Sequence, residues 1–397
     1  MEAPTETAGE GVSFALTPEQ RELRALAREF AEKEIRPKAA EYDERSTHPA
    51  DVIAKAHALG LMNLHLPERL GGPGLGLLEG VLVGEELYRG CSGIATSILA
   101  NGLGAAPVLI AGTDEQRATW LPPLLEEPIL CSFGLSEPDA GSDVARLKTT
   151  AVRRGDEYVL NGSKTFITNA GHAAWTVVFA KTDPAKGHRG ISAFVVPMDA
   201  PGVQIEKHLD KMGQRATDTS AFALSDVVVP AANRLGAEGD GFKIAMQTLD
   251  FTRPGTAAGA VGVAQAAYEH AVEYAKQRVA FDVPIAMHQG VGFLIADMAA
   301  EIEAARLLTW QAAWMLDRGY GRRATLYSSF AKRFAADTAM KVTTDAVQVF
   351  GGYGYIKEYP VEKLMRDAKL FQIYEGTSQI QRLVIAREIF LPREPRP

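Results

Sequence analysis

Apolar residues recur at helical spacing near the start of the chain. Leu23, Leu26, Phe30 and Ile35 fall on one face with charged residues between them, as expected of a helix with one buried stripe. Residues 17–20 combine an N-cap hydroxyl, a proline at the first helical position and a glutamine three residues after the cap, which predicts that a helix begins there. Shorter helical patterns follow, so the first third of the chain is predicted to be helical.

The middle of the chain changes to short runs of β-branched and aromatic residues, which are typical of strands. The runs are Glu157 to Leu160, Thr176 to Ala180, Ile191 to Val196 and Ser225 to Val229. Asn161-Gly162 follows the first run and predicts a hairpin turn, because both residues tolerate a positive φ. Strands and helices do not alternate here, which disfavours a doubly wound sheet and favours a small β domain.

From Gly241 onward the helical period returns in long, alanine-rich stretches, and four long helices predict an antiparallel bundle. These stretches are Thr256 to Gln277, Gly292 to Trp314, Ala324 to Phe350 and Gln379 to Phe390. Small residues between Ala257 and Ala267 predict close helix packing. The predicted fold is mainly α with a central β domain, divided into an α-helical domain (1–128), a β domain (129–236) and a helical bundle (237–397).

Charge and cysteine content exclude several classes of protein. Of the 397 residues, 42 are basic and 49 acidic, a net charge of -7 that argues against the broad basic face of a nucleic-acid-binding protein. Cys91 and Cys131 are too few for a disulfide framework or a four-cysteine zinc site and are predicted to be buried thiols. The sequence has no HExxH, CxxC, Walker or complete GxGxxG motif, and no Glu-x-x-His pair in the bundle. No metal site is predicted.

Two segments bear on targeting. Glu2, Glu6 and Glu10 precede the first basic residue, Arg21, which opposes a mitochondrial transit peptide and favours a cytoplasmic protein. Residues 90–113 carry no charge over about the length of a membrane span. Because this stretch contains asparagine, proline and several glycines, it is predicted to be a buried segment and not a membrane span.

Three short motifs each have an ordinary structural interpretation. Residues 137–143 (EPDAGSD) suit a turn that could also present backbone N–H groups to an anion. Residues 351–354 (GGYG) suit the C-cap of a helix, and residues 374–379 (YEGTSQ) suit a helix start with an N-cap hydroxyl.

Taken together and in order, these motifs resemble the acyl-CoA dehydrogenase family from about Leu16 to Phe390. The matching pieces are Leu135–Pro138 with Ala140–Asp143, Asn161-Gly162 with Lys164 and Phe166–Asn169, Arg278 with Phe281 and Gln289, Gln348–Gly354, and Tyr374–Arg382. Over Tyr359–Asp367 the chain is most similar to the medium-chain members. The resemblance implies an α-helical domain, a β domain and a helical bundle.

The resemblance also implies a mechanism. Family members remove the α-hydrogen of an acyl-CoA as a proton and the β-hydrogen as a hydride to a flavin, giving the trans-2-enoyl-CoA. The weakly acidic α-hydrogen requires a carboxylate made basic in a dry site and donors to the developing enolate oxygen. Glu375 matches the family's base, and its backbone N–H would help to hold the thioester carbonyl. Long-chain and isovaleryl-type members carry the base elsewhere, at a position that is Thr252 here.

By resemblance the cofactor is FAD. The residues expected to lie along the flavin are Phe133, Leu135, Ser136, Ser142, Phe166 and Thr168. Those expected to reach the FAD of a neighbouring subunit are Arg278, Phe281, His288, Gln289, Gln348, Gly351 and Gly352. Thr377 and Gln379 would lie on the adenine-diphosphate side. Substrate contacts would come from Ser142, Asp250, Arg253, Tyr374 and Gly376. The family's usual dimer of dimers is therefore expected. Phe166, where tryptophan is common, Ala280 and Asp282 depart from the pattern.

The function expected from this resemblance is oxidation of saturated, medium- or short-chain acyl-CoA thioesters, with electrons passing to an electron-transferring flavoprotein. An acyl-CoA oxidase, or a dehydrogenase of branched or cyclic thioesters, would share the fold. A DNA-associated binding protein of the same family is a third alternative, and the net charge of -7 and the intact Glu375 motif count against it.

Overall fold

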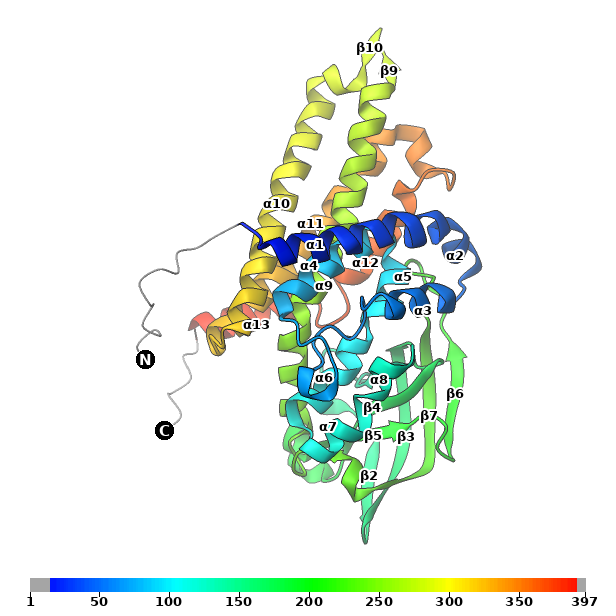
Figure 1. Ribbon diagram of the computed structural model, residues 1–397, viewed down its shortest axis with the longest axis vertical. Helices are drawn as coiled ribbons and strands as arrows, with labels where there is room; N and C mark the ends of the chain where they lie inside the picture. The colour runs from blue at the N-terminus through cyan, green and yellow to red at the C-terminus, as the bar shows by residue number, and fades with distance from the viewer. Residues whose placement is uncertain (1–14, 391–397) are drawn as a thin grey trace.

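The computed structural model describes residues 15–390 and has a β region at one end and a long helical bundle at the other (Figure 1). Glu2, Glu6 and Glu10, on which the targeting prediction depended, lie outside the described residues. Helix α9 runs from the β region to the far end of the bundle and links the two.

The first third of the described chain is helical, as predicted. Its α-helices are α1 (Pro18–Phe30), α2 (Ala39–Arg45), α3 (Ala50–Ala58), α4 (Leu77–Gly90), α5 (Ser92–Leu99), α6 (Asn101–Ala111), α7 (Asp114–Trp120) and α8 (Pro123–Glu126). The capping box of α1 is present, with Thr17 and Gln20 exchanging both hydrogen bonds. Phe30 and Ile35 are buried, whereas Leu26 is 38% exposed and lies at the edge of the predicted stripe.

The uncharged stretch forms two helices inside the molecule. Residues Ser92–Ala111 are long and apolar enough to cross a membrane by length and composition, but they divide into α5 and α6, and 61% of the most apolar window is buried. Cys91, just before this stretch, and Cys131 in strand β1 (Leu130–Gly134) are free and buried, as predicted.

Eight strands form one sheet in the middle of the chain. They are β1 (Leu130–Gly134), β2 (Thr150–Arg154), β3 (Glu157–Thr168), β4 (Ala173–Lys181), β5 (Ile191–Pro197), β6 (Val203–His208), β7 (Thr219–Pro230) and β8 (Arg234–Leu235). The order is β6-β7-β3-β2-β4-β5-β8, with β1 parallel to β4. All four predicted runs lie in strands of this sheet.

The predicted hairpin turn at Asn161-Gly162 is wrong, because both residues lie inside the continuous strand β3. The turn between β2 and β3 is Gly155-Asp156, with Gly155 at φ +62°. Opposite Asn161, β7 carries one extra residue, and the Asn161 side-chain oxygen accepts the Asp226 N–H at 2.8 Å. The dipeptide therefore faces a β-bulge, a feature that shares the turn's preference for asparagine and glycine.

The bundle contains the four predicted helices and one more. They are α9 (Gly241–Gln277), α10 (Gln289–Asp317), α11 (Arg322–Phe350), α12 (Val361–Phe371), which was not predicted, and α13 (Ser378–Phe390). Helix α9 begins at Gly241 and continues through Pro254. Because proline cannot donate to the carbonyl of Asp250 one turn earlier, Ser328 of α11 donates to that oxygen instead, at 3.2 Å.

A short hairpin, β9 (Val279–Ala280) and β10 (Val283–Pro284), joins α9 to α10. Phe281 and Asp282 at its tip both have a positive φ, +55° and +67°. Aspartate tolerates this conformation better than most residues, so Asp282 is compatible with the turn.

Close packing of α4 on α9 explains the small residues of α9. A Cβ atom on Gly262 would lie 2.3 Å from the Glu85 carbonyl oxygen, and one on Gly259 would lie 3.0 Å from the Tyr88 ring. The larger hydrophobic core is shared by α1, α3, α4, α5 and α9–α12. The prediction of close helix packing is confirmed for this face.

The last residue of α10 caps the start of α4. Leu77 and Leu78 donate their N–H groups to the two carboxylate oxygens of Asp317 at 2.7 and 3.1 Å. Gly76, the N-cap residue of α4, has no side chain that could serve these donors. Helix α4, which forms one wall of the cavity described below, is therefore capped by a residue 240 positions later in the chain.

We expect Asp317→Ala to lower the free energy of unfolding by about 1 kcal/mol, because it removes the acceptor of two N–H groups at a helix start. Denaturant unfolding measures this. Asp199→Ala, in an exposed turn after β5, is the control. Equal stability of the two variants would show that the cap contributes nothing.

Candidate active site

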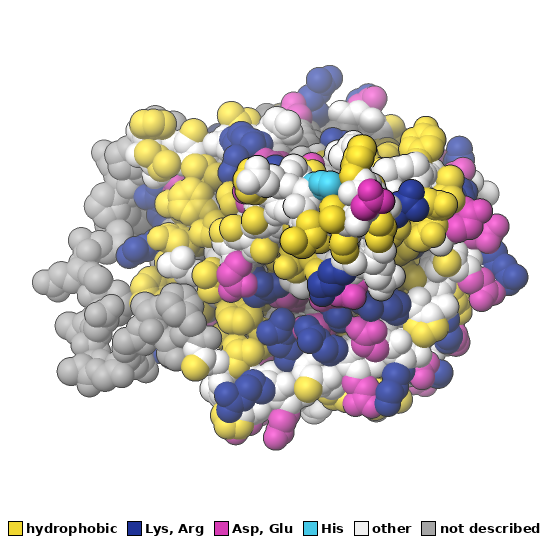
Figure 2. Space-filling model, turned by 90° about the horizontal axis from the view of Figure 1, so that it is seen from above, with side chains coloured by type: hydrophobic (Ala, Val, Ile, Leu, Met, Phe, Trp, Pro, Cys, Tyr) yellow, Lys and Arg dark blue, Asp and Glu magenta, His cyan; other side chains and the backbone are white. Residues whose placement is uncertain are grey.

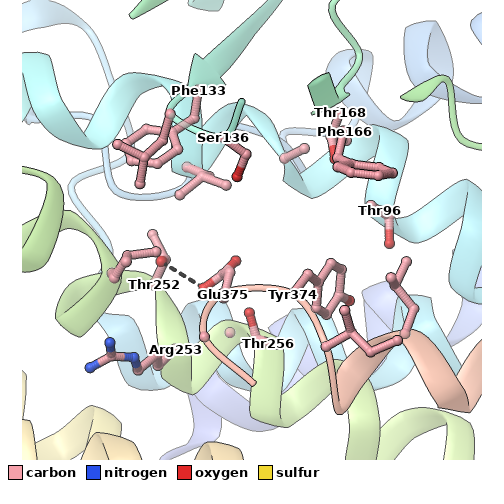
Figure 3. A pocket seen from close by; sticks show the side chains of 18 of the residues that line it. Thr96, Phe133, Ser136, Phe166, Thr168, Thr252, Arg253, Thr256, Tyr374 and Glu375 are labelled. Atoms are coloured by element: carbon pink, nitrogen blue, oxygen red, sulfur yellow. Dashed lines mark hydrogen bonds between the residues drawn. The ribbon is translucent and has the colours of Figure 1, made fainter. Parts of the chain in front are cut away.

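A cavity of about 1200 Å³ lies between the sheet and the helices, and eleven predicted site residues line it. They are Phe133, Leu135, Ser136, Ser142, Phe166, Thr168, Arg253, Tyr374, Glu375, Gly376 and Thr377. Its volume exceeds that of most pockets for small molecules. Figure 3 shows two facing walls, with Phe133, Ser136, Phe166 and Thr168 on one side and Thr252, Tyr374 and Glu375 on the other.

Glu375 lies in the loop between α12 and α13, in an unusual backbone conformation. Its φ is +52° and that of Gly376 is +87°, so two successive residues are in the left-handed region. Thr252 donates its hydroxyl to Glu375 Oε2 at 2.9 Å, and Gln381 Nε2 donates to the Glu375 carbonyl at 3.2 Å (Figure 3). The Glu375 N–H has no acceptor among residues 15–390 and is free to donate to a ligand.

The surroundings make Glu375 more basic than a glutamate in water. Burial raises its pKa above the ordinary value, while hydrogen bonds from Thr252 and Thr256 and the charges of Lys332 and Arg253 act in the opposite direction. Its accessible surface faces the cavity. A carboxylate in this setting is suited to accept a proton from a bound molecule.

Asp250, a carboxylate two residues before the position where other members carry the base, does not line the cavity. It accepts a hydrogen bond from Thr325 at 2.9 Å and forms an ion pair with Arg253. Arg253 does line the cavity; it is 3% exposed, and its Nε–H has no partner in the described part of the chain. Asp250 therefore orients Arg253 and does not itself face the space in front of Glu375.

The wall opposite Glu375 suits a flat heteroaromatic group such as a flavin. Phe133 at the end of β1 and Phe166 near the end of β3 offer rings, and Phe166 is 69% exposed with φ +60°. The hydroxyls of Ser136 and Thr168 border the same space, and neither has a side-chain hydrogen bond within residues 15–390. Rings for stacking and unpaired hydroxyls for ring nitrogen and oxygen atoms fit the FAD that the sequence implies.

The motif at residues 137–143 is a turn, as predicted. Glu137 and Ala140 exchange both backbone hydrogen bonds, at 3.0 and 3.1 Å. Lys164, which is fully buried, donates to the Glu137 carboxylate at 2.8 Å and to the Phe179 carbonyl at 2.7 Å. Burial disfavours the charged form of Glu137, but Lys164 and the N–H groups of Lys148 and Thr149 hold its pKa below the ordinary value. This buried pair fixes the turn that carries Ser142.

The remaining predicted cofactor residues are not brought to this cavity. A second cavity of about 420 Å³ is lined by Arg278, Gly351 and Gly352. The β9–β10 hairpin at the far end of the bundle carries or adjoins Phe281, His288 and Gln289 (Figure 1). Gln348 lies in the last turn of α11. Gly351 is the predicted C-cap, although its ψ of -135° differs from that of a left-handed cap. Thr377 caps α13 by accepting the Ile380 N–H at 3.1 Å, with Gln379 exposed beside it.

Sequence reasoning missed a polar cluster that closes the cavity beside Tyr374. The Thr96 hydroxyl lies 3.1 Å from the Tyr88 hydroxyl and 2.9 Å from Gln214 Oε1, and all three residues are buried. It also missed Lys332 of α11, which is fully buried and donates to the Gly376 carbonyl at 2.6 Å. The available signal for Lys332 was a single lysine on the face of α11 that also carries Ser328, Ser329, Ala335 and Ala336.

Comparison with known proteins agrees with this geometry. The chain matches the acyl-CoA dehydrogenase N-terminal domain over residues 17–128, the middle domain over 132–227 and the C-terminal domain over 239–390. It is 44% identical over 379 residues to a Caenorhabditis briggsae protein named as a probable medium-chain specific acyl-CoA dehydrogenase. The matched region covers 95% of this chain and 91% of the relative.

Two solved structures are similarly close. Butyryl-CoA dehydrogenase from Megasphaera elsdenii is 44% identical with a TM-score of 0.93, covering 95% of this chain and all of that one. A chain in a study of the electron transferring flavoprotein of Acidaminococcus fermentans has the same identity and TM-score, covering 96% of this chain and all of that one. Three domain matches in order, together with full-length relatives, show that the chain belongs to the acyl-CoA dehydrogenase family of FAD-dependent oxidoreductases and is similar to its medium-chain members.

Proposed function

We propose that the protein oxidises saturated acyl-CoA thioesters to trans-2-enoyl-CoA with Glu375 as the base. The observation that carries the proposal is the arrangement of the cavity, in which a half-buried carboxylate of raised pKa faces a wall of rings and unpaired hydroxyls. Bound FAD would supply the hydride acceptor at that wall. The gap between the walls is where the Cα–Cβ bond of the substrate would lie.

The chain's own groups would divide the remaining work. Glu375 takes the α-proton, and its unpaired backbone N–H donates to the thioester carbonyl, where negative charge develops. Thr252 orients the carboxylate. Arg253 and Ser142 would bind the CoA portion, with Asp250, which was expected to contact the substrate, acting through its ion pair with Arg253, while Tyr374 and Gly376 border the acyl group. Thr252, which stands where other members carry their base, has no carboxylate, and the nearby Asp250 does not line the cavity. Of these three positions only Glu375 offers a carboxylate to the cavity.

We further propose that FAD is shared between subunits of a dimer of dimers. Phe133, Leu135, Ser136, Ser142, Phe166 and Thr168 would hold the flavin of their own subunit, and Arg278, Phe281, His288, Gln289, Gln348, Gly351 and Gly352 would reach that of a neighbour, with Thr377 and Gln379 on the diphosphate side. Separation of the two groups within one chain supports this assignment. Hydrophobic side chains gather at the hairpin end, where Phe281, Met287 and Phe293 are 90%, 72% and 64% exposed (Figure 2), as a subunit interface requires.

Closure of the cavity by Tyr88 and Thr96 supports a short- or medium-chain straight acyl group as the substrate. We propose an electron-transferring flavoprotein as the acceptor and the cytoplasm as the location. We also propose that the regions 1–128, 129–236 and 237–397 are its three domains.

The test is anaerobic mixing of the holoenzyme with straight, branched and cyclic acyl-CoAs while the oxidised flavin band is followed. We expect rapid bleaching that is fastest with one short or medium straight chain. Glu375→Gln keeps the shape of the side chain but cannot accept the α-proton, so it should retain FAD and lose at least about 10³-fold in rate.

Glu358→Gln, at an exposed position before α12, is the matched control and should bleach normally. Absence of bleaching with every acyl-CoA despite bound FAD would overturn the proposed reaction, and near-normal bleaching of Glu375→Gln would overturn the role of Glu375. Fast peroxide formation in air, with slow transfer to the flavoprotein, would instead identify an acyl-CoA oxidase.

The acyl length is tested at Tyr88. Its ring packs against Phe371 with 5.7 Å between ring centroids and leaves no room for a Cβ on Gly259. We expect Tyr88→Ala to extend the closed end and to raise the rate for long chains relative to short ones by about tenfold or more. Tyr88→Phe keeps the ring and should keep the wild-type length preference. The same length preference in Tyr88→Ala would mean that Tyr88 does not limit the chain.

A further inference from the structure

A buried lysine lies directly behind the catalytic loop. Lys332 of α11 has no exposed surface, and its ammonium donates to the Gly376 carbonyl at 2.6 Å. Within residues 15–390 it has no carboxylate partner at ion-pair distance. A buried ammonium without a paired carboxylate is costly to stability, so its presence at this position suggests a use beyond packing.

Charged groups from three directions face Lys332. The pKa of Lys332 is lowered to about 8, because burial and the charge of Arg253 on α9 outweigh Glu375 on the loop and Asp337 of α11, which favour the charged form. A pKa of about 8 leaves the side chain mostly protonated at pH 7. The same ammonium, together with Arg253, lowers the pKa of Glu375 against the effect of burial. Lys332 and Glu375 therefore influence each other's charge across the turn.

The turn itself needs an external support. Two successive residues, Glu375 and Gly376, have a positive φ, a conformation that costs free energy at the non-glycine residue and persists only where surrounding contacts hold it. Two side chains provide those contacts: Gln381 donates to both carbonyls, at 3.2 and 3.1 Å, and Lys332 donates to that of Gly376. With both carbonyls held from behind, the carboxylate of Glu375 faces the cavity.

We propose that Lys332 is a positioning residue, which holds the Glu375–Gly376 turn through the Gly376 carbonyl and favours the ionised form of the Glu375 carboxylate by its charge. The inference depends on the reaction proposed above for its kinetic part and on the structure alone for its geometric part. It assigns to α11 a role in the reaction although no atom of Lys332 touches the substrate.

Three substitutions separate the two effects of Lys332. Lys332→Met removes both the charge and the donor, Lys332→Gln keeps a neutral donor, and Lys332→Arg keeps the charge. Lys341→Met is the control, because Lys341 lies on the same helix and pairs with Glu301 at the surface. Each holoenzyme is assayed for its FAD content and for the rate of anaerobic flavin reduction by the best acyl-CoA. The rate is measured from about pH 5 to about pH 9, the range in which a glutamate of raised pKa titrates.

We expect Lys332→Met to reduce the rate at pH 7 by about tenfold or more, with KM changed less than the limiting rate. Loss of the positive charge raises the pKa of Glu375, so the pH of half-maximal second-order rate should move up by about one unit. Lys332→Gln should show the same pH shift, Lys332→Arg should restore the wild-type midpoint, and Lys341→Met should match the wild type. A purely structural lysine would leave the midpoint unmoved in every variant, which would overturn the role of its charge.

A crystal structure of Lys332→Met tests the geometric part without any assay. We expect the Gly376 carbonyl to turn and Glu375 to leave the left-handed region, whereas Lys332→Gln should keep both. An unchanged turn in Lys332→Met would overturn the proposal. If the Met variant does not fold, the pH midpoints of the Gln and Arg variants still decide the charge effect. If the wild type reduces no acyl-CoA, the proposed reaction fails while the crystal structures still decide how the turn is held.

Discussion

The structure depends on keeping one carboxylate both ionised and weakly hydrated. A fully hydrated glutamate is a poor base, and a fully buried glutamate without partners is protonated at neutral pH. Glu375 stands between these limits because burial raises its pKa while Thr252, Thr256, Arg253 and Lys332 lower it. Those groups belong to α9 and α11, and the carboxylate belongs to the loop before α13. The bundle must therefore bring three segments together within hydrogen-bonding and charge range of one side chain.

Helix α9 performs most of this assembly. It presents Thr252, Arg253 and Thr256 to the cavity, continues through Pro254, and reaches Arg278 at the opposite end of the molecule. Helix α4 forms a further wall and is fixed by charge, since Glu86 has no exposed surface and accepts from Arg24 at 2.7 Å and Arg28 at 2.9 Å. Removing one partner of such a buried ion pair strongly lowers the free energy of unfolding, because it leaves a buried charge without compensation. The cavity walls are thus rigid elements, as a site that aligns two reacting groups requires.

Much of this could be predicted from sequence where the signal is local. The capping box at Thr17, the four β-rich runs and the long bundle helices rest on contacts within a few residues, and the structure has them. The predictions fail or fall short where contacts with a distant segment determine the local structure. Asn161-Gly162 is a strand position because β7 carries a bulge opposite it, and α9 passes Pro254 because Ser328 replaces the missing hydrogen bond. Lys332, Tyr88 and Gln214 could not be assigned to the site for the same reason, since only the packing of α4 and α11 places them around the loop.

Part of the backbone strain in the described chain lies at the cavity, since three of the nine non-glycine residues with a positive φ, Asn63, Phe166 and Glu375, line it. Phe166, Asn169, Gln214 and Glu375 have φ values of +60°, +62°, +48° and +52°. Two of them are held by polar contacts, Asn169 through the Ser97 carbonyl and Gln214 through the Asp367 carboxylate. Phe166 differs, because its ring is 69% exposed and faces the cavity. A bulky residue in the left-handed region is unfavourable unless the conformation serves a contact, and the contact available to this ring is with a ligand in front of Glu375. The strained phenylalanine and the strained glutamate thus face one space from opposite walls, so that a flavin held against Phe166 would lie across that space from the Glu375 carboxylate.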